Sequence, residues 1–99
     1  MRAAYLGGSP TALPAISPGA TFAVEIGAIS VQSPAVNSEV ARLVATVDCH
    51  VAIGADPVAS AAAMLLPAGV PEYFTCRDTD KIAVIQEAGP GTLYITAAA

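Results

Sequence analysis

The chain has 99 residues, with four basic and eight acidic side chains and a formal net charge of −4. This length fits one domain, which typically buries somewhat more than about 60% of the surface that its unfolded chain exposes. The basic residues are scattered along the sequence at Arg2, Arg42, Arg77 and Lys81. Binding of nucleic acid driven by counterion release needs clustered Lys and Arg, so the composition argues against it.

The proportion of charged residues is unusually low. It is 12%, against about 25% in an average soluble domain. A small, Ala-rich domain with so few charges favours permanent contact with other subunits. The alternative is a monomer whose surface consists mostly of Thr, Ser, Gly and Ala.

Residues 1–20 predict an extended N-terminal arm. Prolines recur every fourth position at Pro10, Pro14 and Pro18, which excludes a helix interior or a central strand. The arm could pack on its own domain, reach a neighbouring subunit or be a disordered tail. The residues expected to contact a partner are Tyr5, Leu6, Pro10, Leu13, Pro14, Ile16 and Pro18. The first ten residues make a poor signal peptide, and no apolar run approaches the roughly 20 residues that span a bilayer, so we expect a soluble protein made in the cytoplasm.

Residues 21–99 then predict a single all-β domain. Residues 21–31 (TFAVEIGAISV) alternate apolar and other side chains, which indicates a strand. Residues 39–47 also fit helical spacing, but their β-branched content and their continuation into CHVAI favour a strand. Residues 58–63 fit a loop or one helical turn. Short strands follow at residues 64–66, 72–76, 81–87 and 92–96, the last two joined by a hairpin at residues 88–91. Six or seven such strands predict an antiparallel β-sandwich, either jelly-roll-like or immunoglobulin-like, or a small barrel.

Asp48, Cys49 and His50 are consecutive and raise the question of a reactive site. Because side chains alternate between the two faces of a strand, Cys49 is expected in the core and Asp48 and His50 on the opposite face. A nucleophile and its base must lie within hydrogen-bond reach, and a zinc site needs about four ligands. We therefore expect no catalytic, cofactor or metal residues. His50 is expected to be partly exposed and bonded to Asp48, to the backbone or to a neighbouring subunit.

The remaining candidates are also expected to serve the structure. Asp78 and Asp80 fall in a polar turn, where Asp caps its own backbone. The serines lack a GxSxG context, and a single histidine offers only one possible base. Tyr73 and Phe74 are assigned to core packing. Cys49 and Cys76 could be bridged if their strands are neighbours, but two cysteines without an export signal are expected to be free thiols. The sequence therefore predicts that the protein is not an enzyme.

Three segments, VARLVATVDCHVAIGADPVAS, MLLPAGVPEYF and DKIAVIQEAGPGTLYIT, resemble a pattern in small proteins encoded among the virion structural genes of tailed bacteriophages and prophages. The pattern has an H-x-A-x-G-x-x-P element, a variable small-residue loop, an LPAG-x-x-EYF element and two final strands. The resemblance covers approximately residues 40–96. The arm has no counterpart in it.

The resemblance implies a structural component of the virion, assembled in the cytoplasm of the host bacterium. The expected function is a capsid decoration or cement protein that binds the head shell through apolar contacts. Its expected partners are the major capsid or connector protein and further copies of itself, with a trimer as one option. No cofactor, nucleic acid or membrane is expected. The alternatives are a head-tail junction or fibre-base component, or a small glycan- or receptor-binding β-module.

Overall fold

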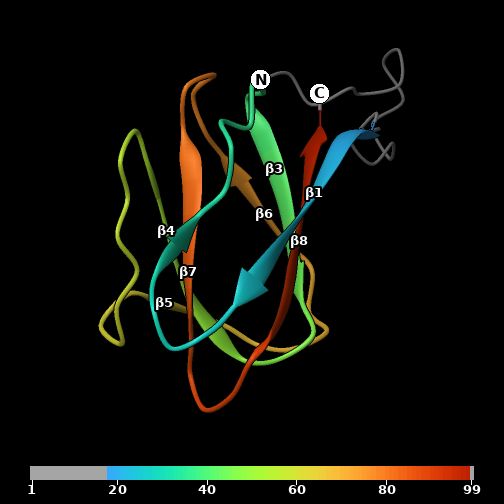
Figure 1. Cartoon of the computed structure of the whole chain (residues 1–99). Helices are drawn as coiled ribbons and strands as arrows, with labels where there is room; N and C mark the ends of the chain where they lie inside the picture. Colours follow the sequence, from blue (N-terminus) through green and yellow to red (C-terminus); the bar gives the residue numbers. More distant parts are fainter. Residues whose placement is uncertain (1–17, 99) are drawn as a thin grey trace.

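Eight β-strands make up most of residues 18–98, the part of the chain that the computed structural model describes (Figure 1). No helix long and apolar enough to cross a membrane occurs within this range. The strands are β1 Pro18–Ile26, β2 Val31–Gln32, β3 Val40–Ala45, β4 Cys49–Gly54, β5 Met64–Leu66, β6 Glu72–Thr75, β7 Lys81–Gln86 and β8 Gly91–Ala98.

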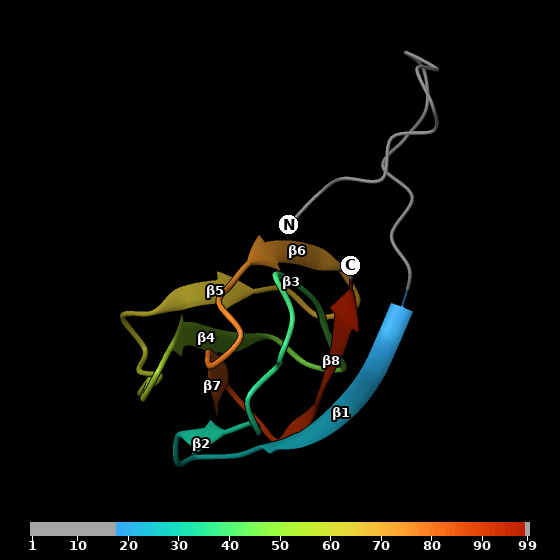
Figure 2. The ribbon, with the colours of Figure 1, turned by 90° about the horizontal axis from the view of Figure 1, so that it is seen from above.

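The strands form two four-stranded antiparallel sheets that face each other (Figure 2). The first sheet has the order β1-β8-β3-β6 and the second the order β2-β7-β4-β5. Consecutive strands lie in opposite sheets, except that β4 pairs directly with β5. This strand order is that of a jelly roll, so the all-β sandwich prediction is confirmed, and of its two versions the structure has the jelly-roll order.

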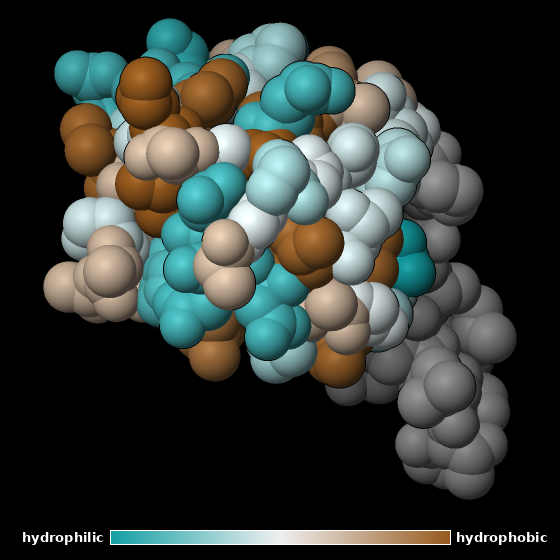
Figure 3. Space-filling model, turned by 60° about the horizontal axis from the view of Figure 1, so that its bottom comes forward, coloured by the Kyte–Doolittle hydropathy of each residue, from teal (hydrophilic) through white to brown (hydrophobic). Residues whose placement is uncertain are grey.

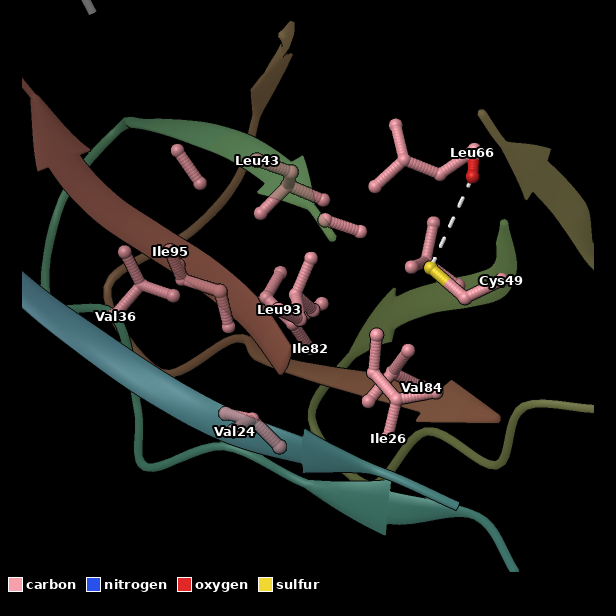
Figure 4. Close-up of a cluster of buried hydrophobic side chains, with 13 residues drawn as sticks. Val24, Ile26, Val36, Leu43, Cys49, Leu66, Ile82, Val84, Leu93 and Ile95 are labelled. Atoms are coloured by element: carbon pink, nitrogen blue, oxygen red, sulfur yellow. Dashed lines mark hydrogen bonds between the residues drawn. The ribbon is translucent and has the colours of Figure 1, made fainter. Parts of the chain in front are cut away.

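The core lies between the two sheets and takes alternate residues from each. Leu43, Leu93 and Ile95 come from the first sheet, and Leu66 and Ile82 from the second, all fully buried (Figure 4). Most side chains of this core are Val, Leu and Ile, and the large exposed hydrophobic residues lie outside it. The sandwich is held together by interdigitated branched aliphatic side chains, each of which contributes about 1.5–3 kcal/mol when fully buried.

The predicted strands were placed largely correctly, but three predicted connections were wrong. Residues 21–31 do not form one strand, because the chain leaves the first sheet at Gly27, whose carbonyl accepts from the Gln86 amide of β7. Residues 39–53 also divide: Thr46 still bonds to Thr92 of β8, whereas the Asp48 carbonyl accepts from Glu87. The chain thus passes from one sheet to the other within three residues.

The third wrong connection is the hairpin expected at residues 88–91. β7 pairs with β2 and β4, whereas β8 pairs with β1 and β3. The Gly- and Pro-containing segment therefore crosses between sheets instead of turning within one. A short loop with turn-forming residues is compatible with either path, so its composition does not decide between them.

The β-domain begins three residues inside the range expected for the arm. Pro18 is the first residue of β1 and pairs with Ala98, and an irregularity separates this pair from the regular register that starts at Thr21. β1 is an edge strand, a position where the missing amide of proline is tolerated. The other expected arm contacts lie outside the described residues: Tyr5, Leu6, Pro10, Leu13, Pro14 and Ile16.

Candidate interaction surface

The three consecutive residues Asp48, Cys49 and His50 point to three different environments. Cys49 is fully buried in the core, as predicted, and its thiol donates to the Leu66 carbonyl at 3.9 Å. Burial, together with the adjacent Asp48 carboxylate, raises the pKa of the Cys49 thiol to about 11. Asp48 precedes β4 and accepts from the Ala68 amide at 2.8 Å. The thiol is therefore held protonated and away from any base.

His50 lies on the outer face of the second sheet, yet it is only 7% exposed, which corrects the expectation of a partly exposed side chain. Its Nδ1 lies 2.9 Å from the Ala63 carbonyl oxygen and its Nε2 lies 2.5 Å from Oε1 of Glu87. The Glu87 carboxylate, followed by the Ala63 carbonyl, raises the pKa of His50 above its ordinary value. His50 thus joins β4 to the segments that contain Ala63 and Glu87. Of its expected partners, the backbone group is present, as the Ala63 carbonyl.

Residues 55–63, which connect β4 to β5, cover the outer face of the second sheet (Figure 2). Gln32 donates to Oδ1 of Asp56 at 2.7 Å and to the Pro57 carbonyl at 2.9 Å, and the Ser30 hydroxyl accepts from the Ala59 amide. Beneath this segment the outward-facing Ala83 is fully buried. We call residues 55–63 the cap, because they cover this outer face over β2, β7 and β4, whereas Leu65 of β5, which pairs with His50 on the same face, stays 50% exposed.

The other polar residues considered from sequence bond to nearby backbone groups. Asp80 caps its turn by accepting from the Arg77 amide at 2.9 Å, as predicted. Ser33 accepts from Ile82, Ser38 donates to Ala98, and Ser60 accepts from Ala62. Within residues 18–98, no three His, Cys, Asp or Glu side chains lie close enough together to hold a metal ion.

The two cysteines lie in different places. Cys49 belongs to β4, whereas Cys76 follows β6 at the edge of the first sheet, and both are free thiols. The Cys76 thiol donates to the Ser38 carbonyl at 3.0 Å. Burial raises the pKa of the Cys76 thiol, and Asp80 and Asp78 add to this effect.

The outer face of the first sheet is open except at one end, where Val40 and Ala98 are buried. We define the open face by the outward residues of its four strands that are not buried: Thr21, Ala23 and Glu25 of β1, Thr92, Tyr94 and Thr96 of β8, Arg42 and Val44 of β3, and Tyr73 and Thr75 of β6. Its only charged side chains are Glu25 and Arg42, and the others are tyrosines, threonines and small apolar residues. Tyr73 is 53% exposed and Tyr94 42% exposed, so both rings are available to a partner.

Cross-strand pairing arranges the open face in rows. One row runs from Thr21 through Thr96 and Arg42 to Tyr73, with a 3.1 Å bond between the Thr21 and Thr96 hydroxyls. Tyr94 lies in the next row, between Ala23 and Val44. Strand spacing and rise place the Cα atoms of Tyr73 and Tyr94 roughly 12 Å apart. The two rings therefore flank Arg42 on one surface.

The assignment of Tyr73 to the core was wrong. Phe74 packs against the core, and its neighbour in the strand must face outward. The alternation in EYFT already contained this signal, but alternation alone does not say which of two adjacent aromatic residues faces inward.

A second exposed apolar pair joins the cap to the segment before β2. Ile29 is 77% exposed and Val58 73% exposed, and the bond between Ser30 and Ala59 holds their segments together. Elsewhere, the end of the sandwich opposite the termini carries hydrophobic side chains in separate patches between hydrophilic ones (Figure 3). The pair involves two loop segments, whereas the open face extends over four strands.

Comparisons of the chain with protein-family models, with curated proteins and with solved structures found no match. The resemblance to phage virion proteins therefore depends on the sequence segments that carry it.

Proposed function

We propose that this chain is a non-enzymatic structural protein of a tailed-phage virion, which binds the head shell through its open face. The observation that carries the proposal is the contrast between the two outer faces of the sandwich. The cap covers the outer face of the second sheet over β2, β7 and β4 and leaves Leu65 exposed at its edge, whereas the outer face of the first sheet exposes Tyr73 and Tyr94 in a charge-poor surface. Exposed Tyr with few charged neighbours is typical of the centres of protein interfaces.

The fold and the charge distribution support the proposal. Jelly rolls serve in viral capsids, although they also serve in lectins and cupins, so the fold alone does not decide. A decoration protein repeats the same contact around a symmetric shell, and a surface with one acid and one base allows such close packing without like-charge repulsion. The separate environments of Asp48, Cys49 and His50 give no support to a reaction at these residues.

The test uses phage particles assembled in a host that carries the phage genome without this gene. The purified wild-type chain is added, the particles are sedimented, and the bound chain is quantified. The proposal expects saturable binding by the wild-type chain and a loss of at least about tenfold in affinity for the double variant Tyr73→Ser/Tyr94→Ser, since two hot-spot residues are removed.

The matched control is the double variant Ile29→Ser/Val58→Ser, which removes the exposed apolar pair formed by the cap and the segment before β2. It should bind particles as the wild-type chain does. Equal binding by the wild-type chain and the tyrosine variant, or failure of the wild-type chain to bind at all, would overturn the proposal. Cryo-electron microscopy of the loaded particles then distinguishes the head shell from the head-tail junction or the fibre base.

A glycan-binding module is the second candidate, and the spacing of the two tyrosines is the observation that favours it. Two exposed rings flanking Arg42 offer stacking faces and a hydrogen-bond donor. A glycan array probed with the wild-type chain and with Tyr73→Ser/Tyr94→Ser tests this candidate, which needs a signal that the variant loses.

A further inference from the structure

An apolar groove of about 490 Å³ opens at the end of the sandwich where the chain enters β1 and leaves β8. Ala20 and Phe22 of β1, Val36 and Asn37 of the segment before β3, and Ala97 and Ala98 of β8 line it. This volume lies within the range of sites that hold small ligands or a few side chains, about 300–1,000 Å³. The groove is distinct from the open face and from the cap.

Backbone hydrogen bonds fix the wall that residues 36–38 contribute. The amides of Val36 and Asn37 donate to the carbonyls of Asp80 and Asp78 at 2.9 and 3.0 Å. Asn37 adopts a left-handed conformation with φ of 56°, and the Ser38 hydroxyl donates to the Ala98 carbonyl. A wall that is held before binding loses little conformational entropy when an occupant arrives.

The lining indicates an uncharged, branched apolar occupant. Ala20, Ala97 and Ala98 leave space because their side chains are small, and Phe22 and Val36 supply apolar contact area. None of the lining residues carries a charge. The backbone amide of Asn37 and the Ser38 hydroxyl are already used in bonds within the fold.

The segment before β1 has the matching chemistry. Seventeen residues precede Pro18, and after Arg2 they contain no charged residue, with Leu13 and Ile16 three positions apart. At up to about 3.3 Å per residue, they can reach roughly 55 Å from the groove. The length and composition of this segment therefore suit it to a groove that begins at Gly19.

The stereochemistry around Pro18 favours the groove of another molecule. Ser17 precedes a proline, which biases it toward extended conformations, and the ring of Pro18 fixes its own φ. Entry into the adjacent groove of the same chain requires a sharp reversal at this point. We propose that the groove binds Leu13 and Ile16 from the N-terminal arm of a second copy of this chain. The inference does not rest on the proposed function, which uses the open face and not the arm.

The experiment uses the full chain and two variants that each lose one half of the contact. Leu13→Asp/Ile16→Asp impairs the arm and keeps the groove, whereas Ala20→Trp fills the groove and keeps the arm. Light scattering after size exclusion should find the wild-type chain associated and each variant monomeric. A mixture of the two variants should form a 1:1 heterodimer, because one intact arm then meets one intact groove.

The control variants separate this inference from the proposed function. Ala88→Trp places the same ring at an exposed position between β7 and β8 and should associate as the wild-type chain does. Tyr73→Ser/Tyr94→Ser should also still associate, even though it is expected to lose binding to particles. A monomeric wild-type chain at the highest soluble concentration overturns the inference, and so does a variant mixture that stays monomeric. The latter result would mean that the arm occupies its own groove or that another surface joins the copies.

Discussion

The imidazole of His50 and the carboxylate of Glu87 meet at 2.5 Å between Nε2 and Oε1, although 37 positions separate the two residues in the sequence. The second ring nitrogen faces the Ala63 carbonyl oxygen. A carbonyl and a carboxylate are both acceptors, so only the doubly protonated ring donates to both. The arrangement therefore favours the imidazolium form.

This pairing makes stability depend on pH. Because the pKa of His50 is raised above 6.5 by folding, the folded chain binds a proton more tightly than the unfolded chain does. The stabilisation is fully present below pH 6.5 and is lost as pH rises through the folded-state pKa. Thermal unfolding at pH values from about 5.5 to 8.5 should show His50→Gln losing most stability relative to wild type at the acid end. A constant difference across this range would contradict the assignment.

The two thiols should differ in reactivity. Cys49 is fully buried with a pKa of about 11, whereas Cys76 is partly exposed. Since the thiolate is the reactive species, alkylation of the native chain near pH 8 should modify Cys76 well before Cys49. Mass spectrometry of the labelled peptides measures both rates, and the denatured chain, in which the rates should converge, is the control. Equal rates in the native chain would count against the buried position of Cys49.

Gly91 should not tolerate a side chain. A Cβ atom there would lie 2.6 Å from Oγ1 of Thr46 and 2.6 Å from Cγ2 of Val47. Gly91→Ala should therefore cost about 1–3 kcal/mol of unfolding free energy through overpacking. Gly89→Ala is the matched control, because nothing lies within 4 Å of a Cβ atom at that position. Urea denaturation should show a lower midpoint for the first variant only, and equal midpoints would refute the close contact.

Truncation of core side chains should separate full from partial burial. Leu93 is fully buried, whereas Ile53 is only partly buried against the core. Leu93→Ala should cost about 2–5 kcal/mol, and Ile53→Ala should cost less. Chemical denaturation of both variants tests this order. The reverse order would mean that the register of β4 differs from the one described.

The sequence predicted the elements of this fold better than their connections. Alternation in residues 21–26 and the β-branched run at residues 40–45 indicate strands because side-chain period and backbone preference agree there. The transfers between sheets at Gly27 and at residues 46–48 leave no such signal. Each depends on hydrogen bonds to residues about 40 or more positions away, such as the Gln86 amide that donates to Gly27.

Prediction from sequence meets the same limit in the environment of His50. Alternation correctly placed Cys49 in the core and His50 on the opposite face. The partners of the imidazole could not be predicted, because Glu87 and Ala63 are brought to it by the pairing of β4 with β7 and β5. Local patterns predict the face of a strand, whereas the contacts on that face depend on the long-range topology.

The cap offers a place to attach foreign peptides. Ala61 and Ala62 lie exposed at its tip, and the bonds that hold the cap to the sheet involve Asp56, Pro57, Ala59 and Ala63 on either side of them. Insertions are tolerated best at such exposed tips of small residues. An epitope inserted between Ala61 and Ala62 would project from the side of the sandwich opposite Tyr73 and Tyr94. The two sides of this domain would thus serve as one surface for anchoring and one for display.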